Sequence, residues 1–124
     1  MNQRQVLQNN AARTILDLPK YASATQAIDQ LTWKPLVSRR CSHRRVAMYK
    51  CLNGLVNFNH DFRKNGDHGY NTRGSEKIRV PKSKTNWGLQ RFVVHAVNDW
   101  NSVPEHIKQA EILTRFKSLL ATNF

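Results

Sequence analysis

The chain has 124 residues, 40% of them apolar, and its 20 Lys and Arg against 8 Asp and Glu give a formal net charge of +12. A chain of this length can bury one modest core, so we expect a single domain over residues 1–124, or a fragment of a larger protein, rather than two domains. Such a positive charge repels itself in a compact monomer and predicts an anionic partner, with RNA or DNA as the first candidate. The alternative is a solvated basic surface that only aids solubility.

Membrane and secreted classes are not expected. No apolar run approaches the roughly 18–20 residues that span a bilayer, and the first ten residues lack the apolar region of a signal peptide. Cys41 and Cys51 would lie roughly 15 Å apart on one helix, which is too far for a disulfide. These features predict reduced thiols, no membrane partner and an intracellular location, either nucleus or cytoplasm.

Two helices are predicted before residue 33. The first covers residues 3–18 and ends before Pro19, with an amide-rich outer face. Ser23 to Gln26 has the form of a capping box and should start a short second helix that ends near Leu31. Trp33 then packs on the core. The apolar residues that recur at intervals of three and four in the first helix are Val6, Leu7, Ala11, Ile15 and Leu18.

A long basic helix is predicted between Pro35, which suits a first helical turn, and Asn53-Gly54, which suits a helix end. No acidic residue occurs from Lys34 to Lys50. The spacing predicts a buried seam made of Val37, Cys41, Met48, Cys51, Leu52 and Leu55. The expected phosphate contacts on the opposite face are Arg39, Arg40, Arg44, Arg45 and Lys50.

Residues 55–62 are expected to add a helical turn, and residues 63–86 a long basic loop of the kind that usually has a function. Charged and apolar residues alternate in the segment 77–80, which is the pattern of a short edge strand or hairpin limited by Pro81; a mobile loop is the equal alternative. Tyr70 and Trp87 are candidates for base stacking, although Trp87 also suits a packing role at the start of a helix. The expected phosphate contacts in this segment are Lys77, Arg79, Lys82 and Lys84.

The last third predicts a helix from Trp87 to Trp100, capped by Thr85 or Asn86. A turn follows, for which Ser102 is a candidate cap, and then a final helix over residues 111–120. The predicted fold is therefore mainly α, a small helical bundle of about five helices with helical parts 1–62 and 87–124 on either side of the basic loop. The turn contains Ile107. The apolar residues expected inside from this part are Phe92, Val93, Ala96, Val97, Trp100, Ile112, Leu113, Phe116, Leu119 and Leu120.

Catalytic patterns are missing from the sequence. There is no adjacent acidic pair for a two-metal site, no Gly-rich phosphate loop, and no CxxC or HxxxH spacing for zinc. We therefore expect no catalytic residue, no metal and no cofactor.

An ordered set of short motifs runs through nearly the whole chain. In the first half these are Ala11-Ala12-Arg13, then Leu31, Trp33, Pro35-Leu36 and Arg39-Arg40, then Tyr49-Lys50 and Leu52-Asn53-Gly54-Leu55. In the second half they are Arg79-Val80-Pro81, Lys84-Thr85-Asn86 with Gly88, Arg91-Phe92, Trp100-Asn101-Ser102 with Pro104, and Phe116-Lys117 with Leu120. In this order the chain resembles the carboxy-terminal region of non-LTR (LINE-type, jockey-like) retrotransposon reverse transcriptases.

The resemblance implies an origin in an RNA-directed DNA polymerase, in which this region is expected to support binding of template RNA or target DNA. The catalytic aspartate pair and the endonuclease domain of such elements are absent, so the resemblance implies no enzyme activity for this chain alone. Valine replaces leucine at Val103, and Val56 stands where the family commonly has proline. A second hypothesis is that the chain packs on a missing polymerase domain without binding nucleic acid by itself.

Overall fold

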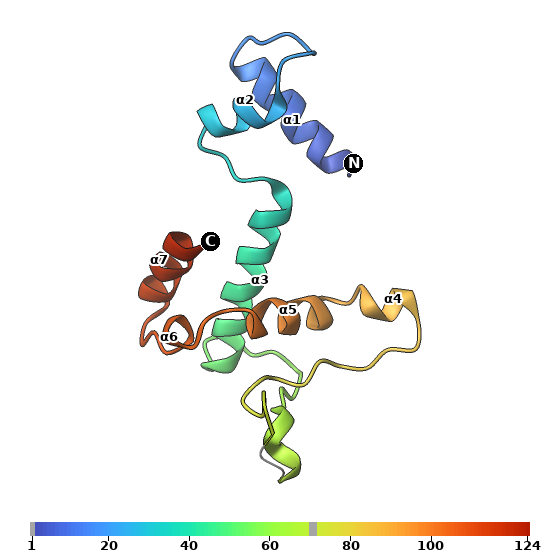
Figure 1. The fold of residues 1–124 in the computed structure, drawn as a ribbon, viewed down its shortest axis with the longest axis vertical. Helices are drawn as coiled ribbons and strands as arrows, with labels where there is room; N and C mark the ends of the chain where they lie inside the picture. Colours follow the sequence, from blue (N-terminus) through green and yellow to red (C-terminus); the bar gives the residue numbers. More distant parts are fainter. Residues whose placement is uncertain (1, 70–71) are drawn as a thin grey trace. The chain divides into compact units, whose positions relative to one another are not determined.

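The structure is a computed structural model that describes residues 2–69 and 72–124 (Figure 1). Five α-helices have seven or more residues: α1 (Gln3–Ile15), α2 (Ala24–Gln30), α3 (Leu36–Leu52), α5 (Phe92–Asn101) and α7 (Leu113–Asn123). Shorter elements are the 3-10 helix η1 (Asn65–His68) and the single-turn helices α4 (Asn86–Leu89) and α6 (Glu105–Lys108). The described part of the chain contains no strand, which confirms the predicted mainly α fold.

The chain divides into two compact units, one ending at Arg40 and the other beginning at Cys41, so that the division falls within α3. Each unit is described by itself below. The expectation of a single domain over residues 1–124 stays a prediction. Among the described residues, no helix has both the length and the apolar character needed to cross a bilayer.

In the first unit, α2 begins as its capping pattern predicted, because the Ser23 hydroxyl accepts a hydrogen bond from the Gln26 N–H at 3.4 Å. α1 ends earlier than predicted, at Ile15 rather than at residue 18. A small cluster of Ala12, Ala27 and Ile28 is buried between the two helices, and Trp33 packs against it. The predicted structural role of Trp33 is therefore confirmed.

Most of the apolar residues that define the period of α1 are exposed. Leu7 and Ile15 are 68% and 60% exposed, and Val6 and Ala11 are exposed as well, whereas Asn9 is buried. The helix thus turns part of its amide-rich face inward. Leu18, which follows the end of α1, is partly buried against the small cluster.

Long-range hydrogen bonds explain this orientation. The Gln5 amide oxygen accepts from the backbone N–H of Leu36 at 3.0 Å, which satisfies an N–H at the start of α3 that has no partner within the helix. The Gln8 side chain donates to the backbone carbonyl of Lys34 at 3.0 Å, and Gln5 also donates to Asn9 at 2.9 Å. Hydrophobic periodicity contains no information about such pairings.

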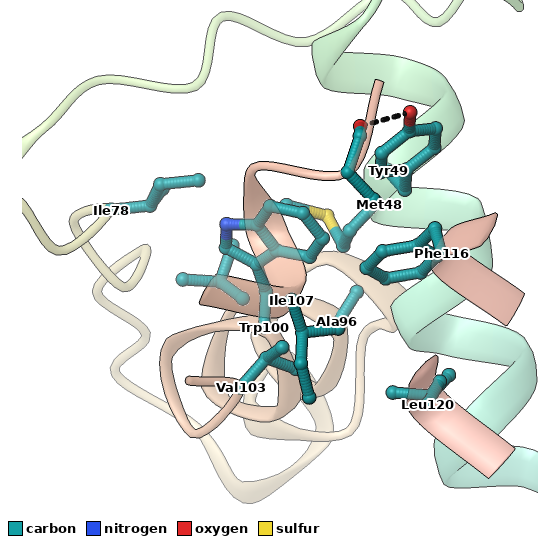
Figure 2. Packing of buried hydrophobic residues seen from close by; sticks show 11 residues of the cluster. Met48, Tyr49, Ile78, Ala96, Trp100, Val103, Ile107, Phe116 and Leu120 are labelled. Atoms are coloured by element: carbon teal, nitrogen blue, oxygen red, sulfur yellow. Dashed lines mark hydrogen bonds between the residues drawn. The ribbon is translucent and has the colours of Figure 1, made fainter. Parts of the chain in front are cut away.

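The core of the second unit collects side chains from α3, α5, α6 and α7 (Figure 2). The rings of Tyr49 and Phe116 stack with centroids 4.4 Å apart, and Trp100 lies 5.8 Å from Phe116. The buried Tyr49 hydroxyl donates to the carbonyl of Ala110 at 2.7 Å, so its polar end is satisfied. The buried residues of this core are Met48, Tyr49, Ile78, Ala96, Val97, Trp100, Val103, Ile107, Ala110, Phe116 and Leu120.

The predicted seam of α3 is largely wrong. Its buried residues are Arg45, Met48 and Tyr49, whereas Val37 and Leu55 are exposed. The remaining seam residues are partly buried or exposed: Cys41, Cys51 and Leu52. Residues 45, 48 and 49 are three and four positions apart and therefore share one face of the helix. The prediction missed this face because it includes Arg45, which was expected to be exposed to solvent on account of its charge.

Four further segments differ from the predictions. Residues 55–62 contain no helix, and residues 77–80 form no strand, only an isolated bridge between Lys64 and Ile78. The helix predicted over 87–100 is divided into α4 and α5 because Arg91 has an extended backbone, with ψ of 145°. The predicted last helix starts two residues later, which leaves Ile112 exposed, and its buried residues are Phe116 and Leu120.

Candidate nucleic-acid interface

Arg39 and Arg40 lie in the amino-terminal half of α3, within the first unit. Arg39 is exposed and Arg40 is partly exposed, and neither side chain forms an ion pair within residues 2–69 and 72–124. Both guanidinium groups therefore keep their donors for a ligand. Arginine suits this role because its planar fork binds phosphate oxygens in pairs.

Arg44 and Arg45 do not form the exposed basic face that the sequence predicted. Arg44 forms an ion pair with the carboxylate of Asp99 in α5. Arg45 is only 8% exposed, donates to the Asp99 carbonyl at 3.4 Å and to the Ser102 hydroxyl at 3.2 Å, and stacks its guanidinium 3.9 Å from the ring centroid of Phe124. These two side chains stabilise the packing of α3 on the end of α5.

The loop 63–86 is anchored in the middle by Ile78. Its side chain is buried in the core of the second unit, and its backbone N–H and carbonyl pair with the Asn101 amide at 3.0 and 2.9 Å. On either side of this anchor, the backbone of Lys77 accepts from Asn65 at 2.8 Å and that of Arg79 donates to Arg63 at 2.7 Å. The described part of the loop is thus held by paired backbone groups and one buried side chain, although it contains no strand.

The four loop cations expected to contact phosphates are all exposed and have no carboxylate partner among the described residues. They are Lys77, Arg79, Lys82 and Lys84. Lys50, from the last turn of α3, is partly buried and likewise forms no ion pair there.

Two other loop cations are neutralised locally. Lys64 binds Glu76 at 2.8 Å, and this hydrogen bond is the main reason that the pKa of Lys64 is raised. Arg63 binds Asp61 at 2.9 Å. Both pairs are exposed, so each contributes little to stability, but they reduce the positive charge at the start of the loop.

The second unit contains a cleft of about 330 Å³ that the sequence analysis did not predict. Lys108 extends into it, with its ammonium 5.5 Å from the Trp100 ring centroid and 4.0 Å from the Glu105 carboxylate. Burial lowers the pKa of Lys108, and the positive charges of Lys64 and Lys77 lower it further, against the opposing effect of Glu105. No sequence signal links Trp100 to Lys108, because their proximity depends on the turn before α6.

Of the two stacking candidates, Tyr70 lies outside the described residues. Trp87 projects from α4 and is 88% exposed, so the packing role considered for it at the start of a helix is wrong. Nearby, Thr85 is the cap of α4, as the sequence predicted, and accepts from the Gly88 N–H at 3.1 Å.

Groups suited to metal binding are not clustered: the described residues contain no set of three or more His, Cys, Asp or Glu side chains that could hold an ion. Cys41 and Cys51 are free thiols, and burial raises the pKa of both. A raised pKa makes a thiol less reactive at neutral pH.

Comparisons with models of protein families, with curated proteins and with solved structures found no match to this chain.

Proposed function

We propose that the chain is a non-catalytic nucleic-acid-binding segment that contacts phosphates through the basic loop 63–86, with further contacts from Arg39, Arg40 and Lys50. The supporting observation is the row of exposed loop cations without carboxylate partners in the described structure, on a backbone anchored through Ile78. Arg44 and Arg45 are left out of the contact set because their side chains pair with Asp99 and Ser102.

Phosphate contacts determine the properties expected of this interface. They give affinity and register with little choice of sequence, and each one makes binding weaker as salt rises, because counterions are released on binding. The resemblance to reverse transcriptases of non-LTR retrotransposons suggests which ligand is bound, namely template RNA or target DNA. Primer extension by the purified chain should be absent, because the motifs of the polymerase active site are missing.

A pair of charge reversals tests the loop. Lys82→Glu/Lys84→Glu should weaken binding to RNA and reduce the slope of log affinity against log salt by about two, one for each contact. Arg115→Glu/Lys117→Glu, on exposed positions of α7, changes the net charge by the same amount and serves as the matched control. Equal losses in the two variants would mean that net charge, and not the loop, determines binding.

A second candidate function is packing on a polymerase domain. It is favoured by the exposed apolar stripe of α1, in which Leu7, Ala11 and Ile15 follow one another at intervals of four. Leu7→Gln/Ile15→Gln should remove dye binding and self-association by the isolated chain while leaving RNA affinity unchanged. A wild-type chain that binds no dye and sediments as a monomer would argue against this candidate.

A further inference from the structure

Trp87 stands apart from the other tryptophans of the chain. Trp33 packs on the small cluster of the first unit and Trp100 is buried in the core of the second, but the indole of Trp87 is 88% exposed. Single exposed apolar side chains are ordinary in proteins. The surroundings of this one distinguish it.

The short helix α4 is held in a defined turn. The Ser83 hydroxyl accepts from the N–H of Thr85 at 3.4 Å and donates to the Thr85 carbonyl at 3.2 Å, and Thr85 caps Gly88. A Cβ on Gly88 would clash with the Ser83 side chain, so the close approach of these two residues favours glycine. The backbone that carries Trp87 is therefore fixed by local hydrogen bonds, not by burial of the indole.

Positive charge surrounds this turn on both sides along the chain. No Asp or Glu occurs from Lys77 through Asn98. The Arg91 Nε donates to the carbonyl of Gly88 at 3.1 Å, which holds a guanidinium group beside α4. Cations without acidic neighbours in the sequence favour a polyanionic partner, such as nucleic acid.

Two side-chain amides lie beside the Trp87 indole and can form hydrogen bonds with a base. Asn86, Trp87 and Gln90 line a shallow pocket of about 190 Å³. Helix α4, which carries Asn86 and Trp87, is labelled in Figure 1. Side-chain amides carry both donors and acceptors, so those beside the indole can pair with the edge of a base that lies on it. An aromatic face combined with flanking cations is the arrangement by which proteins bind unpaired nucleotides.

We propose that Trp87 is a stacking platform for an unpaired base, and that the ligand of the basic loop is single-stranded nucleic acid. The proposal rests on the phosphate-binding function above. The base lies on the indole, the amides of Asn86 and Gln90 flank it, and Lys82, Lys84 and Arg91 contact the neighbouring phosphates. Bases in a duplex are stacked on each other and offer no free face, so a duplex ligand gains only the phosphate contacts.

The test uses the full chain and three probes: a short oligouridine, an abasic oligomer of equal length that has phosphates without bases, and an RNA duplex. The variants are Trp87→Ala and Trp87→Phe, and Tyr21→Ala is the matched control because Tyr21 is 91% exposed on the first unit. Trp87→Ala should weaken oligouridine binding roughly 5- to 150-fold without changing the salt slope. Trp87→Phe should retain most of the affinity, and binding of the abasic oligomer should be the same in all variants.

Tryptophan fluorescence gives a second readout in the wild-type chain, which needs no variant to fold. Oligouridine should quench the exposed indole, and the abasic oligomer should not. Salt-dependent binding without quenching, and with equal affinity in wild type and Trp87→Ala, would overturn the stacking proposal and leave the phosphate-binding function standing. Absence of salt-dependent binding to all three probes would overturn both.

Discussion

The side-chain amide of Asn101 pairs with both backbone groups of Ile78, accepting from its N–H at 3.0 Å and donating to its carbonyl at 2.9 Å. One residue at the end of α5 thus supplies the hydrogen bonds that a neighbouring strand would otherwise give. The Ile78 side chain is buried beside these bonds, and the exposed cations Lys77 and Arg79 lie on either side of it.

Asn101→Ala should destabilise the second unit by roughly 1–3 kcal/mol, because it leaves two backbone groups of a buried residue without partners. Urea unfolding followed by circular dichroism measures this loss. Asn98→Ala, at an exposed position of the same helix, is the control and should change stability little. Equal effects of the two substitutions would mean that the Asn101 amide does not anchor the loop.

Arg45→Ala should cost roughly 1–3 kcal/mol of stability, because Arg45 is buried and its hydrogen bonds to Asp99 and Ser102 are lost. Arg39→Ala, at an exposed position of α3, should leave the free energy of unfolding nearly unchanged but weaken RNA binding. Denaturant unfolding and an RNA titration of both variants separate the two roles. A stable Arg45→Ala protein with weakened RNA binding would return Arg45 to the contact set.

Gly88→Ala should disturb the turn that carries Trp87, since the new methyl group would displace the Ser83 side chain and its hydrogen bonds to Thr85. The expected cost in global stability is small, about 1 kcal/mol or less, because α4 has no buried residue. Backbone amide chemical shifts should change around residues 83–90 and stay constant in the core. Unchanged shifts at Ser83 and Thr85 would contradict the close packing described.

Local sequence signals predicted the parts of the fold that depend on local physics. At the caps Ser23 and Thr85, the side-chain oxygen accepts from the backbone N–H three residues further along the chain. The strongly apolar residues Trp100 and Phe116 are buried. Hydrogen bonds between residues far apart in the sequence could not be predicted from these local signals. Asn101 and Ile78 are 23 residues apart in the sequence, so no pattern within the loop predicted that Asn101 would anchor it.

Charge was the most misleading signal within the second unit. Arg45 was predicted at the surface because arginine is charged and usually solvated. In the structure its side chain is buried, and its guanidinium group contacts the Asp99 carbonyl, the Ser102 hydroxyl and the Phe124 ring. The predicted seam of α3 also omitted Tyr49, which is the largest fully buried side chain among the described residues.

The pH dependence of stability should contain a contribution from Lys108, whose pKa is lowered from 10.5 mainly by burial. Between the folded pKa and 10.5 the unfolded chain binds more protons than the folded chain, so this contribution increases stability as pH rises through that window. Unfolding free energies of wild type and Lys108→Met, measured across alkaline pH, should show the wild type gaining relative to the variant. Lys117→Met controls for the loss of one positive charge, and a constant difference between wild type and Lys108→Met would contradict the burial of Lys108.

The most direct test of phosphate binding is the affinity of the wild-type chain for single-stranded RNA, double-stranded RNA and duplex DNA across a salt series. The account predicts salt-dependent binding with a slope near −0.7 per phosphate on a single strand, about four or more phosphates in total, and the tightest binding to the single strand. Binding that is weak at low salt, or that shows no dependence on salt for any of the three, would contradict it.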